Sequence, residues 1–181
     1  MPTTASTASS TRKTQATAPA EKTAARGRRP DAVTLLKADH AEVKKCFKAY
    51  QKLVDKDADG GERQAMAEQI CLLLTVHAQI EEEIFYPAAR EVLGEAVDLV
   101  DEADVEHASA KDLIAQIQSM QPDDDHYDAK VKVLGEYIDH HVQEEQDEMF
   151  PKVKDAGMDT KAVGQQLSER KDELMAGRLS A

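Results

Sequence analysis

HAQIEEEIFYP (residues 77–87) and HVQEEQDEMFP (residues 141–151) share one pattern: a histidine, a glutamate four positions later, and a proline six positions after the glutamate. Residues four apart on a helix lie on the same face, one turn apart, so each copy presents an imidazole and a carboxylate in the same direction. Two further histidines, His40 and His107, are separated by almost the same interval as the two copies. This repetition of ligand types favours a metal site shared by four helices.

The composition fits a single helical domain. The chain has 181 residues, of which 41% are hydrophobic and only 4% aromatic, so we expect an aliphatic core. Glycine and proline are sparse and long apolar periodicities dominate, which favours an all-α fold. The longest apolar run, Ile70–Leu74, is far shorter than the roughly 20 residues that span a bilayer, and no secretory leader is recognisable. Two cysteines form no disulfide framework. We therefore expect a cytoplasmic protein without a membrane span.

The charge is distributed unevenly along the chain. The net charge is −12, but residues 1–30 carry six basic side chains and one acid, which leaves −17 on the rest. Ser, Thr and Ala dominate these 30 residues without apolar periodicity, so we expect a disordered basic tail. Such a tail is simply solvated, or contacts an anionic partner weakly, or is an organelle transit peptide. The acidic remainder argues against a folded nucleic-acid surface.

Four long helices are expected, over about 31–55, 62–91, 95–120 and 126–155. Each has apolar residues at helical spacing, with one histidine in the same register. Short turns between long helices predict an up-down-up-down antiparallel four-helix bundle over residues 31–156. Pro87 is expected to kink the second helix or to end its regular part. A short amphipathic helix is expected within residues 157–181, packing on the bundle or trailing from it.

The turns predict that the four histidines lie at one height. Residues equidistant from the turn of an antiparallel helix pair sit side by side. Three turns, recognised from their Gly, Pro and Asp content, lie midway between consecutive histidines: Asp57–Gly60, Leu93–Gly94 and Pro122–Asp125. The bundle therefore places all four imidazoles in one layer of its core. Glu81 and Glu145 lie one turn along, on the second and fourth helices, and enter this layer from opposite corners.

A shared metal site explains this layer better than four separate core histidines. Four buried imidazoles without partners would cost several kcal/mol of desolvation, which a metal relieves. Imidazole with carboxylate suits Fe, Mn or Zn, and no cysteine is expected at this level. So many donors suit two ions bridged by the glutamates, with one position open for an exogenous ligand. The predicted metal ligands are His40, His77, Glu81, His107, His141 and Glu145.

His140 is an alternative to His141, because His140 and Glu144 are also four residues apart. We prefer His141 for two reasons. It aligns with His77 relative to the aromatic-proline pair that ends each copy, and it continues the apolar stripe of the fourth helix.

These residues, in this order, resemble the hemerythrin-like family, also called HHE cation-binding domains. The similarity covers about residues 31–155 and rests on the motif His, His-x3-Glu, His, His-x3-Glu with matching connecting lengths. It implies a four-helix bundle with a non-haem di-iron centre that binds dioxygen or related small ligands. By this resemblance the four histidines are terminal ligands, and Glu81 and Glu145 are the bridges.

One departure from the family concerns the third helix. Oxygen-carrying members place two histidines one turn apart there, whereas Ala103 and Lys111 stand four residues either side of His107. One imidazole is therefore missing. A water, Glu106 or Tyr137 is left to complete the metal shell, and the sequence does not choose between them.

Three functions follow from these expectations. The first is binding of iron and of dioxygen or a related ligand, for oxygen binding, storage or sensing. The alternative is an enzyme of oxidative or nitrosative stress that acts on peroxide or nitric oxide, since a more open site favours turnover. The third is a purely structural bundle that recruits a partner through its tail.

Overall fold

The computed structural model describes residues 30–179, and all the regular structure in this range is helical. The predicted basic tail lies outside the described residues, apart from Pro30 at its end. The elements are α1 (Ala32–Asp55), α2 (Gly60–Ile80), η1 (Glu81–Phe85), α3 (Tyr86–Leu93), η2 (Gly94–Val97), α4 (Asp98–Gln118), α5 (Tyr127–Glu144), η3 (Glu145–Met149), α6 (Phe150–Asp155) and α7 (Thr160–Leu179).

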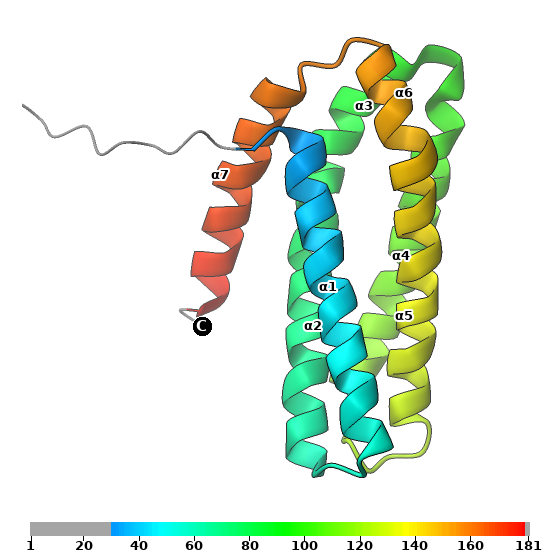
Figure 1. Ribbon diagram of the computed structural model, residues 1–181, viewed down its shortest axis with the longest axis vertical. Coiled ribbons are helices and arrows are strands. Elements are labelled where there is room, and N and C mark those ends of the chain that lie inside the picture. The colour runs from blue at the N-terminus through cyan, green and yellow to red at the C-terminus, as the bar shows by residue number, and fades with distance from the viewer. Residues whose placement is uncertain (1–29, 180–181) are drawn as a thin grey trace, which may run out of the picture.

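Four antiparallel rods form the predicted up-down-up-down bundle (Figure 1). The first rod is α1, the second runs from α2 through η1 into α3, the third is η2 with α4, and the fourth runs from α5 through η3 into α6. The all-α bundle expected from the sequence is thus confirmed. None of the described helices is both long and apolar enough to cross a membrane.

The helix ends follow local chemistry. Asp31 caps α1, because its Oδ1 accepts a hydrogen bond from the Thr34 backbone N–H at 3.2 Å. The turns that separate the rods hold residues with positive φ: Asp57 at 52°, Gly94 at 55° and His126 at 72°. Asp, Gly and His tolerate this left-handed backbone better than most residues. Asp57 and Gly94 follow the ends of the first and second rods, and His126 directly precedes the fourth.

A π-helical turn interrupts the second and the fourth rod at the predicted bridging glutamates. In η1 the backbone N–H of Tyr86 bonds to the carbonyl of Glu81, five residues back instead of four. The equivalent bond in η3 joins Phe150 to Glu145. Each turn therefore contains one extra residue, and it begins at the same position of both sequence copies.

Proline accounts for the position of both π turns. Each π turn is followed by an α-helix that has a proline in its first turn: Pro87 in α3 and Pro151 in α6. A proline lacks the N–H of a regular helix, and its ring clashes with the carbonyl four residues earlier. A widened turn before the proline removes this conflict, so the rod continues to Leu93. The predicted kink or end at Pro87 is thus realised as a π turn.

The core consists of two apolar clusters with a polar layer between them. One cluster gathers residues from the first turns of α1, from α3, from α6 and from α7. The other gathers residues from the second half of α1, from α2, and from the end of the bundle where α4 meets α5. On each rod, the predicted histidine falls between the stretches that enter the two clusters.

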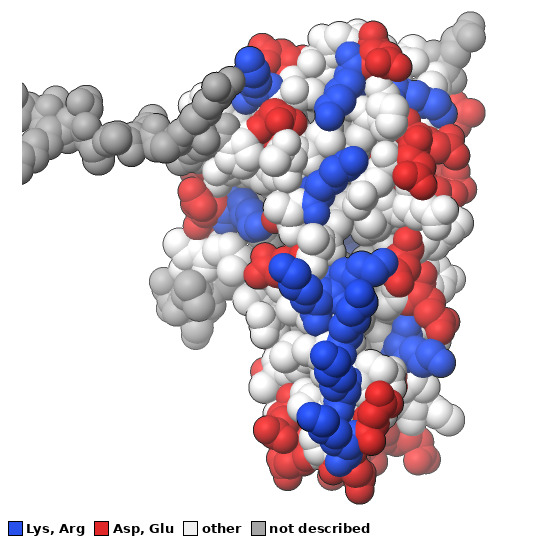
Figure 2. All heavy atoms as spheres, in the orientation of Figure 1, with Lys and Arg blue, Asp and Glu red and all other residues white. Residues whose placement is uncertain are grey.

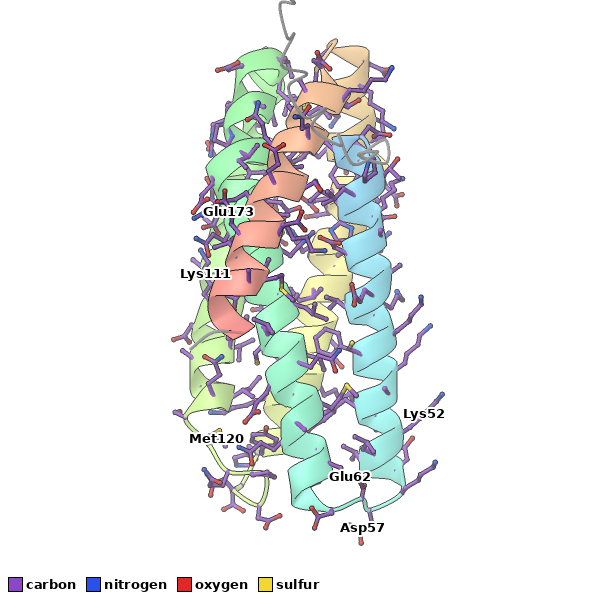
Figure 3. The ribbon with its side chains drawn as sticks, turned by 90° about the vertical axis from the view of Figure 1, so that its left-hand side faces the viewer. Lys52, Asp57, Glu62, Lys111, Met120 and Glu173 are labelled. Carbon is purple, nitrogen blue, oxygen red and sulfur yellow. The ribbon has the colours of Figure 1, made fainter. Side chains whose placement is uncertain are left out.

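α7 is the expected C-terminal helix and has 20 residues, of which the buried ones lie in its first half. It runs back along α1 and α2, as Figures 1 and 3 show. Leu167 is fully buried, and Gly164 touches the start of α1. A Cβ on Gly164 would lie 2.5 Å from the Ala32 backbone nitrogen and 2.6 Å from the Pro30 carbonyl oxygen, so only glycine allows this contact.

Basic side chains line α1 on the face shown in Figure 2. Lys37, Lys44, Lys48 and Lys52 are all exposed on this helix, and Lys44 pairs with Asp139 at 2.9 Å. The acidic body therefore has a local basic face, which its net charge does not reveal.

Candidate metal centre

The four predicted histidines meet in the middle of the bundle. His40 comes from α1, His77 from α2, His107 from α4 and His141 from α5, and each is at most 5% exposed. Their Nε2 atoms converge: those of His40 and His77 lie 2.9 Å apart, and those of His107 and His141 lie 3.2 Å apart. The imidazoles thus form two pairs at one level, as the turn positions predict.

Each glutamate lies between the two pairs. Glu81 Oε2 is 3.2 Å from His77 Nε2 and 3.5 Å from His107 Nε2. Glu145 occupies the equivalent place, with its Oε2 3.2 Å and 3.6 Å from the Nε2 atoms of the other two histidines. Metal–ligand bonds of about 2.0–2.2 Å separate neighbouring donor atoms by about 3.0–3.5 Å, so these spacings fit coordination of metal.

The two carboxylates are strongly desolvated. Glu81 is 0% and Glu145 1% exposed, and no described residue hydrogen-bonds either oxygen of Glu81 or Oε2 of Glu145. Burial, together with the charge of Glu145, raises the pKa of Glu81 well above its usual value. Burial also acts to raise the pKa of Glu145, but the nearby imidazoles, of which His40 Nε2 lies 3.2 Å from Oε2, outweigh it and lower the pKa below its usual value. A cation between such carboxylates would relieve their desolvation cost.

The outer nitrogens of three imidazoles have partners within the bundle. These contacts are His107 Nδ1 to Glu82 Oε1 at 2.9 Å, His141 Nδ1 to Glu106 Oε2 at 2.8 Å, and His40 Nδ1 to the Gln146 side-chain amide at 3.0 Å. The carboxylates of Glu82 and Glu106 accept from Nδ1 and so leave the inner Nε2 of His107 and His141 free to bind metal, whereas the amide nitrogen of Gln146 donates to Nδ1 of His40. The outer nitrogen of His77 has no hydrogen-bond partner within residues 30–179; Asp39 Oδ2 lies 3.6 Å from it.

Tyr86 enters the centre, although the sequence reasoning did not select it. Its hydroxyl lies 3.2 Å from His107 Nε2 and donates to Glu145 Oε1 at 3.1 Å. Burial and the adjacent carboxylates of Glu81 and Glu145 raise its pKa well above the usual value. The available signal was its position directly before Pro87. In the second copy the equivalent residue is an apolar ring.

The other candidates for completing the metal shell lie elsewhere. Tyr137 is 48% exposed, and Glu106 bonds to the outer nitrogen of His141 rather than to its inner one. His140 is also at the surface, with a side chain that is 64% exposed, and forms a group with Glu106 and Glu144. The structure thus turns His141 inward and His140 outward, as expected from the apolar stripe.

A small cavity adjoins the imidazoles. It has a volume of about 20 Å³. The four histidines form part of its wall, and apolar side chains such as Val43, Leu74, Ile114 and Ile138 form much of the rest. It lies towards the apolar cluster at the loop end of α4 and α5, on the opposite side of the imidazoles from η1 and η3. The space is large enough for about one water-sized molecule.

The family model for the hemerythrin HHE cation binding domain matches residues 31–153. The chain belongs to the hemerythrin HHE cation-binding domain family. The match spans the bundle and includes all six predicted ligands. As an HHE domain, the protein binds metal cations, and the buried histidines and glutamates are groups that could hold one.

Two individual proteins resemble this HHE domain. A crystal structure of a hemerythrin HHE cation binding domain-containing protein from Mycobacterium kansasii matches with a TM-score of 0.68 and 22% identity, over 83% of this chain and 91% of that chain. This similarity supports the fold. A protein from Nostoc sp. named DNA nickase is 29% identical over 122 residues, which are 66% of this chain. The match covers only 32% of the nickase, so this chain spans about a third of that relative.

Proposed function

We propose that the protein is a non-haem di-iron protein that binds dioxygen or a related small ligand. The observation that carries this proposal is the position of the two carboxylates, each of which lies between imidazoles of both pairs. One ion would take His40 and His77, the other would take His107 and His141, and Glu81 and Glu145 would bridge them. Imidazole with carboxylate is a donor set that iron accepts.

The cavity beside the imidazoles supports a small ligand. Its volume of about 20 Å³ is close to the smallest space that holds one water-sized molecule. Its apolar wall favours an uncharged diatomic molecule such as dioxygen or nitric oxide over larger or charged compounds. Iron bound at the centre would supply electrons to such a ligand. The protein side chains hold the imidazole tautomers and keep bulk water away.

An enzyme acting on peroxide or nitric oxide is a second candidate, and Tyr86 favours it. The Tyr86 hydroxyl approaches His107 and Glu145 at the distances that separate the predicted ligands from one another. It therefore occupies a place where an additional oxygen donor would complete the metal shell that the missing imidazole leaves open. An anionic oxygen donor stabilises oxidised iron, which opposes reversible oxygen binding and favours turnover.

DNA cleavage is not part of the proposal. The Nostoc relative is named a DNA nickase, but only 32% of it is matched. The six predicted ligands are at most 5% exposed, so a phosphodiester in a duplex could not reach them. The contact between the basic tail and an anionic partner stays a prediction, because those residues lie outside the described part of the chain.

Metal analysis tests the proposal. Protein produced in iron-replete medium is expected to hold about two irons per chain, with charge-transfer absorption that apo-protein lacks. Replacing His141 by Ala is expected to lower the iron content to one or less, because it removes an inner donor. His140→Ala is the matched control one residue away and should retain two irons. A colourless protein that takes up no iron would refute the proposal.

Stopped-flow mixing separates the two candidates. Reduced, iron-loaded protein is mixed with dioxygen, and in parallel with hydrogen peroxide or nitric oxide. A long-lived spectrum that disappears on removal of oxygen, without peroxide consumption, supports the binding protein. Rapid consumption of peroxide or nitric oxide over many turnovers supports the enzyme.

A further inference from the structure

His77 differs from the other three imidazoles because its outer nitrogen, Nδ1, has no hydrogen-bond partner in the described chain. The other outer nitrogens have partners on the bundle rods at 2.8–3.0 Å. His77 Nδ1 faces Asp39 Oδ2 at 3.6 Å, which is slightly too long for a hydrogen bond. Both atoms are buried and have no hydrogen-bond partner within residues 30–179. A shift of about 0.7 Å would pair them at the usual distance.

Asp39 is a buried carboxylate, and its other oxygen accepts a hydrogen bond from the C-terminal helix α7. Asp39 is 7% exposed, and its Oδ1 accepts a hydrogen bond from Lys171 Nζ of α7 at 2.6 Å. A buried carboxylate needs a counter-charge. The ammonium group of Lys171, 2.6 Å from Asp39 Oδ1, supplies this counter-charge.

The packing of α7 against α1 and α2 positions Lys171 beside Asp39. Figure 3 shows α7 lying across the side of the bundle formed by α1 and α2, which carry Asp39 and His77. Gly164 and Leu167 fix the first half of the helix against the bundle. The neighbouring Arg170 pairs with Glu83 of η1 at 2.6 Å.

We infer that Lys171 is a positioning residue for the metal centre: through α7 it holds the Asp39 carboxylate against His77 Nδ1. An acceptor at Nδ1 keeps the proton there, leaves Nε2 free for metal and makes it more basic. The C-terminal helix thus provides for His77 the carboxylate acceptor that Glu82 provides for His107 and Glu106 for His141. This inference rests on the proposed function, because it concerns the ligand role of His77.

The test compares metal release among four variants of the full chain. Co(II) is the probe, because its visible absorption reports on its ligands. Lys171→Met and Asp39→Asn are expected to speed release to a chelator at least tenfold, in line with partner losses around other metal sites, and to alter the Co(II) spectrum. Lys171→Arg should restore slow release, because it keeps the cation. Arg170→Met is the matched control: it removes an ion pair of the same helix without touching Asp39, and release should stay within about twofold of wild type.

Two results would overturn the inference. Equal acceleration in Lys171→Met and Arg170→Met would show that the lysine only docks α7. Unchanged release and spectrum in Lys171→Met would show that it does not act on His77 at all.

A measurement without metal separates this inference from the proposed function. In the apo-protein, ¹⁵N NMR of the imidazoles is expected to show His77 protonated at Nδ1, and Lys171→Met is expected to shift the tautomer population while the other histidines stay unchanged. If wild-type protein binds neither Co(II) nor iron, the proposed function fails, and the tautomer shift alone decides whether Lys171 positions His77. An unchanged His77 signal in Lys171→Met counts against the inference whatever the metal content.

Discussion

Glu81 places a carboxyl group without hydrogen-bond partners in the core of the metal-free protein. Glu81 is completely buried, both of its oxygens are without partners in the described chain, and its pKa is raised. A carboxyl group with a higher pKa in the folded state than in the unfolded chain costs stability as soon as the unfolded group ionises. Retaining such a residue makes sense only if something else binds there.

Glu81→Gln is expected to stabilise the metal-free protein and to abolish metal binding. Glu81 ionises near pH 4.5 when unfolded and at a higher pH when folded, so wild type loses stability as pH rises above 4.5. Glutamine does not ionise, so the variant does not lose stability in this way as the pH rises. The variant should match wild type near pH 4 and exceed it by about 1–3 kcal/mol at neutral pH, measured by urea unfolding in a chelator. Glu148→Gln, at an exposed position of η3, is the control and should change neither quantity. A variant less stable than wild type at pH 7 would contradict this expectation.

Tyr86→Phe tests the hydroxyl in the centre. The change keeps the ring and removes the donor to Glu145, so it should cost about 1 kcal/mol in the metal-free protein. In the iron-loaded protein, any visible band from tyrosinate-to-iron charge transfer should vanish. Tyr50→Phe removes another buried hydroxyl that bonds a carboxylate, Asp128, far from the centre. Tyr50→Phe should lower the free energy of unfolding by a similar amount and leave the visible spectrum unchanged. Identical spectra for all three proteins would exclude Tyr86 as a ligand.

At this scale the sequence predicted how the ligands converge but not Tyr86. The four-residue spacing of His and Glu holds on any helix, and the turns fixed the common height. Tyr86 stands five residues after Glu81, which on a regular helix is about 140° away around the axis. The extra residue of the π turn brings its hydroxyl back to the centre. Periodicity alone could not reveal a local change of period. The role of the six side chains as metal ligands stays a prediction.

The packing of α7 on the bundle depends on the contact between Gly164 and the start of α1. Gly164 lets the helix touch the backbone at the start of α1, and Leu167 one turn later is fully buried. The sequence predicted a helix here, but it left open whether that helix packs or trails. Nothing in its apolar spacing shows which surface it meets, because its partner residues are distant in sequence: Arg170 and Glu83, for example, are 87 positions apart.

Gly164→Ala is expected to destabilise the protein by about 1–3 kcal/mol, because the new methyl would overlap backbone atoms that cannot move easily. The control on the same helix is Gly177→Ala, where a Cβ has no neighbour within 4 Å. That change should be neutral or stabilise the helix by up to about 1 kcal/mol. Urea unfolding of the two variants measures the difference. Equal effects would mean that α7 does not pack as described.

In the whole molecule, the polar layer separates two apolar clusters that would otherwise form one core. Metal bound by the six predicted ligands would contact all four rods and thereby link the clusters. The stability of the protein is therefore expected to depend on occupancy of the centre.

Removal of metal is expected to lower the melting temperature by about 5–10 °C. A ligand at a hundred times its Kd adds about 2.7 kcal/mol, and 1 kcal/mol corresponds to about 2–4 °C for a chain of this size. Scanning calorimetry with and without chelator measures the shift. His140→Ala should keep the difference, and His141→Ala should reduce it. Equal melting temperatures of loaded and stripped wild type would show that the layer is stable without an ion.

The predicted ligands are divided between parts of the chain that could be produced as separate fragments. The stretch before the Pro122–Asp125 turn contributes His40, His77, Glu81 and His107, while the stretch after it contributes only His141 and Glu145. A cut between α3 and α4 would instead give fragments with two imidazoles and one carboxylate each. Neither fragment could build the coloured centre alone, so its absorption would appear only on recombination. The protein could in this way serve as a split reporter whose signal is the metal itself.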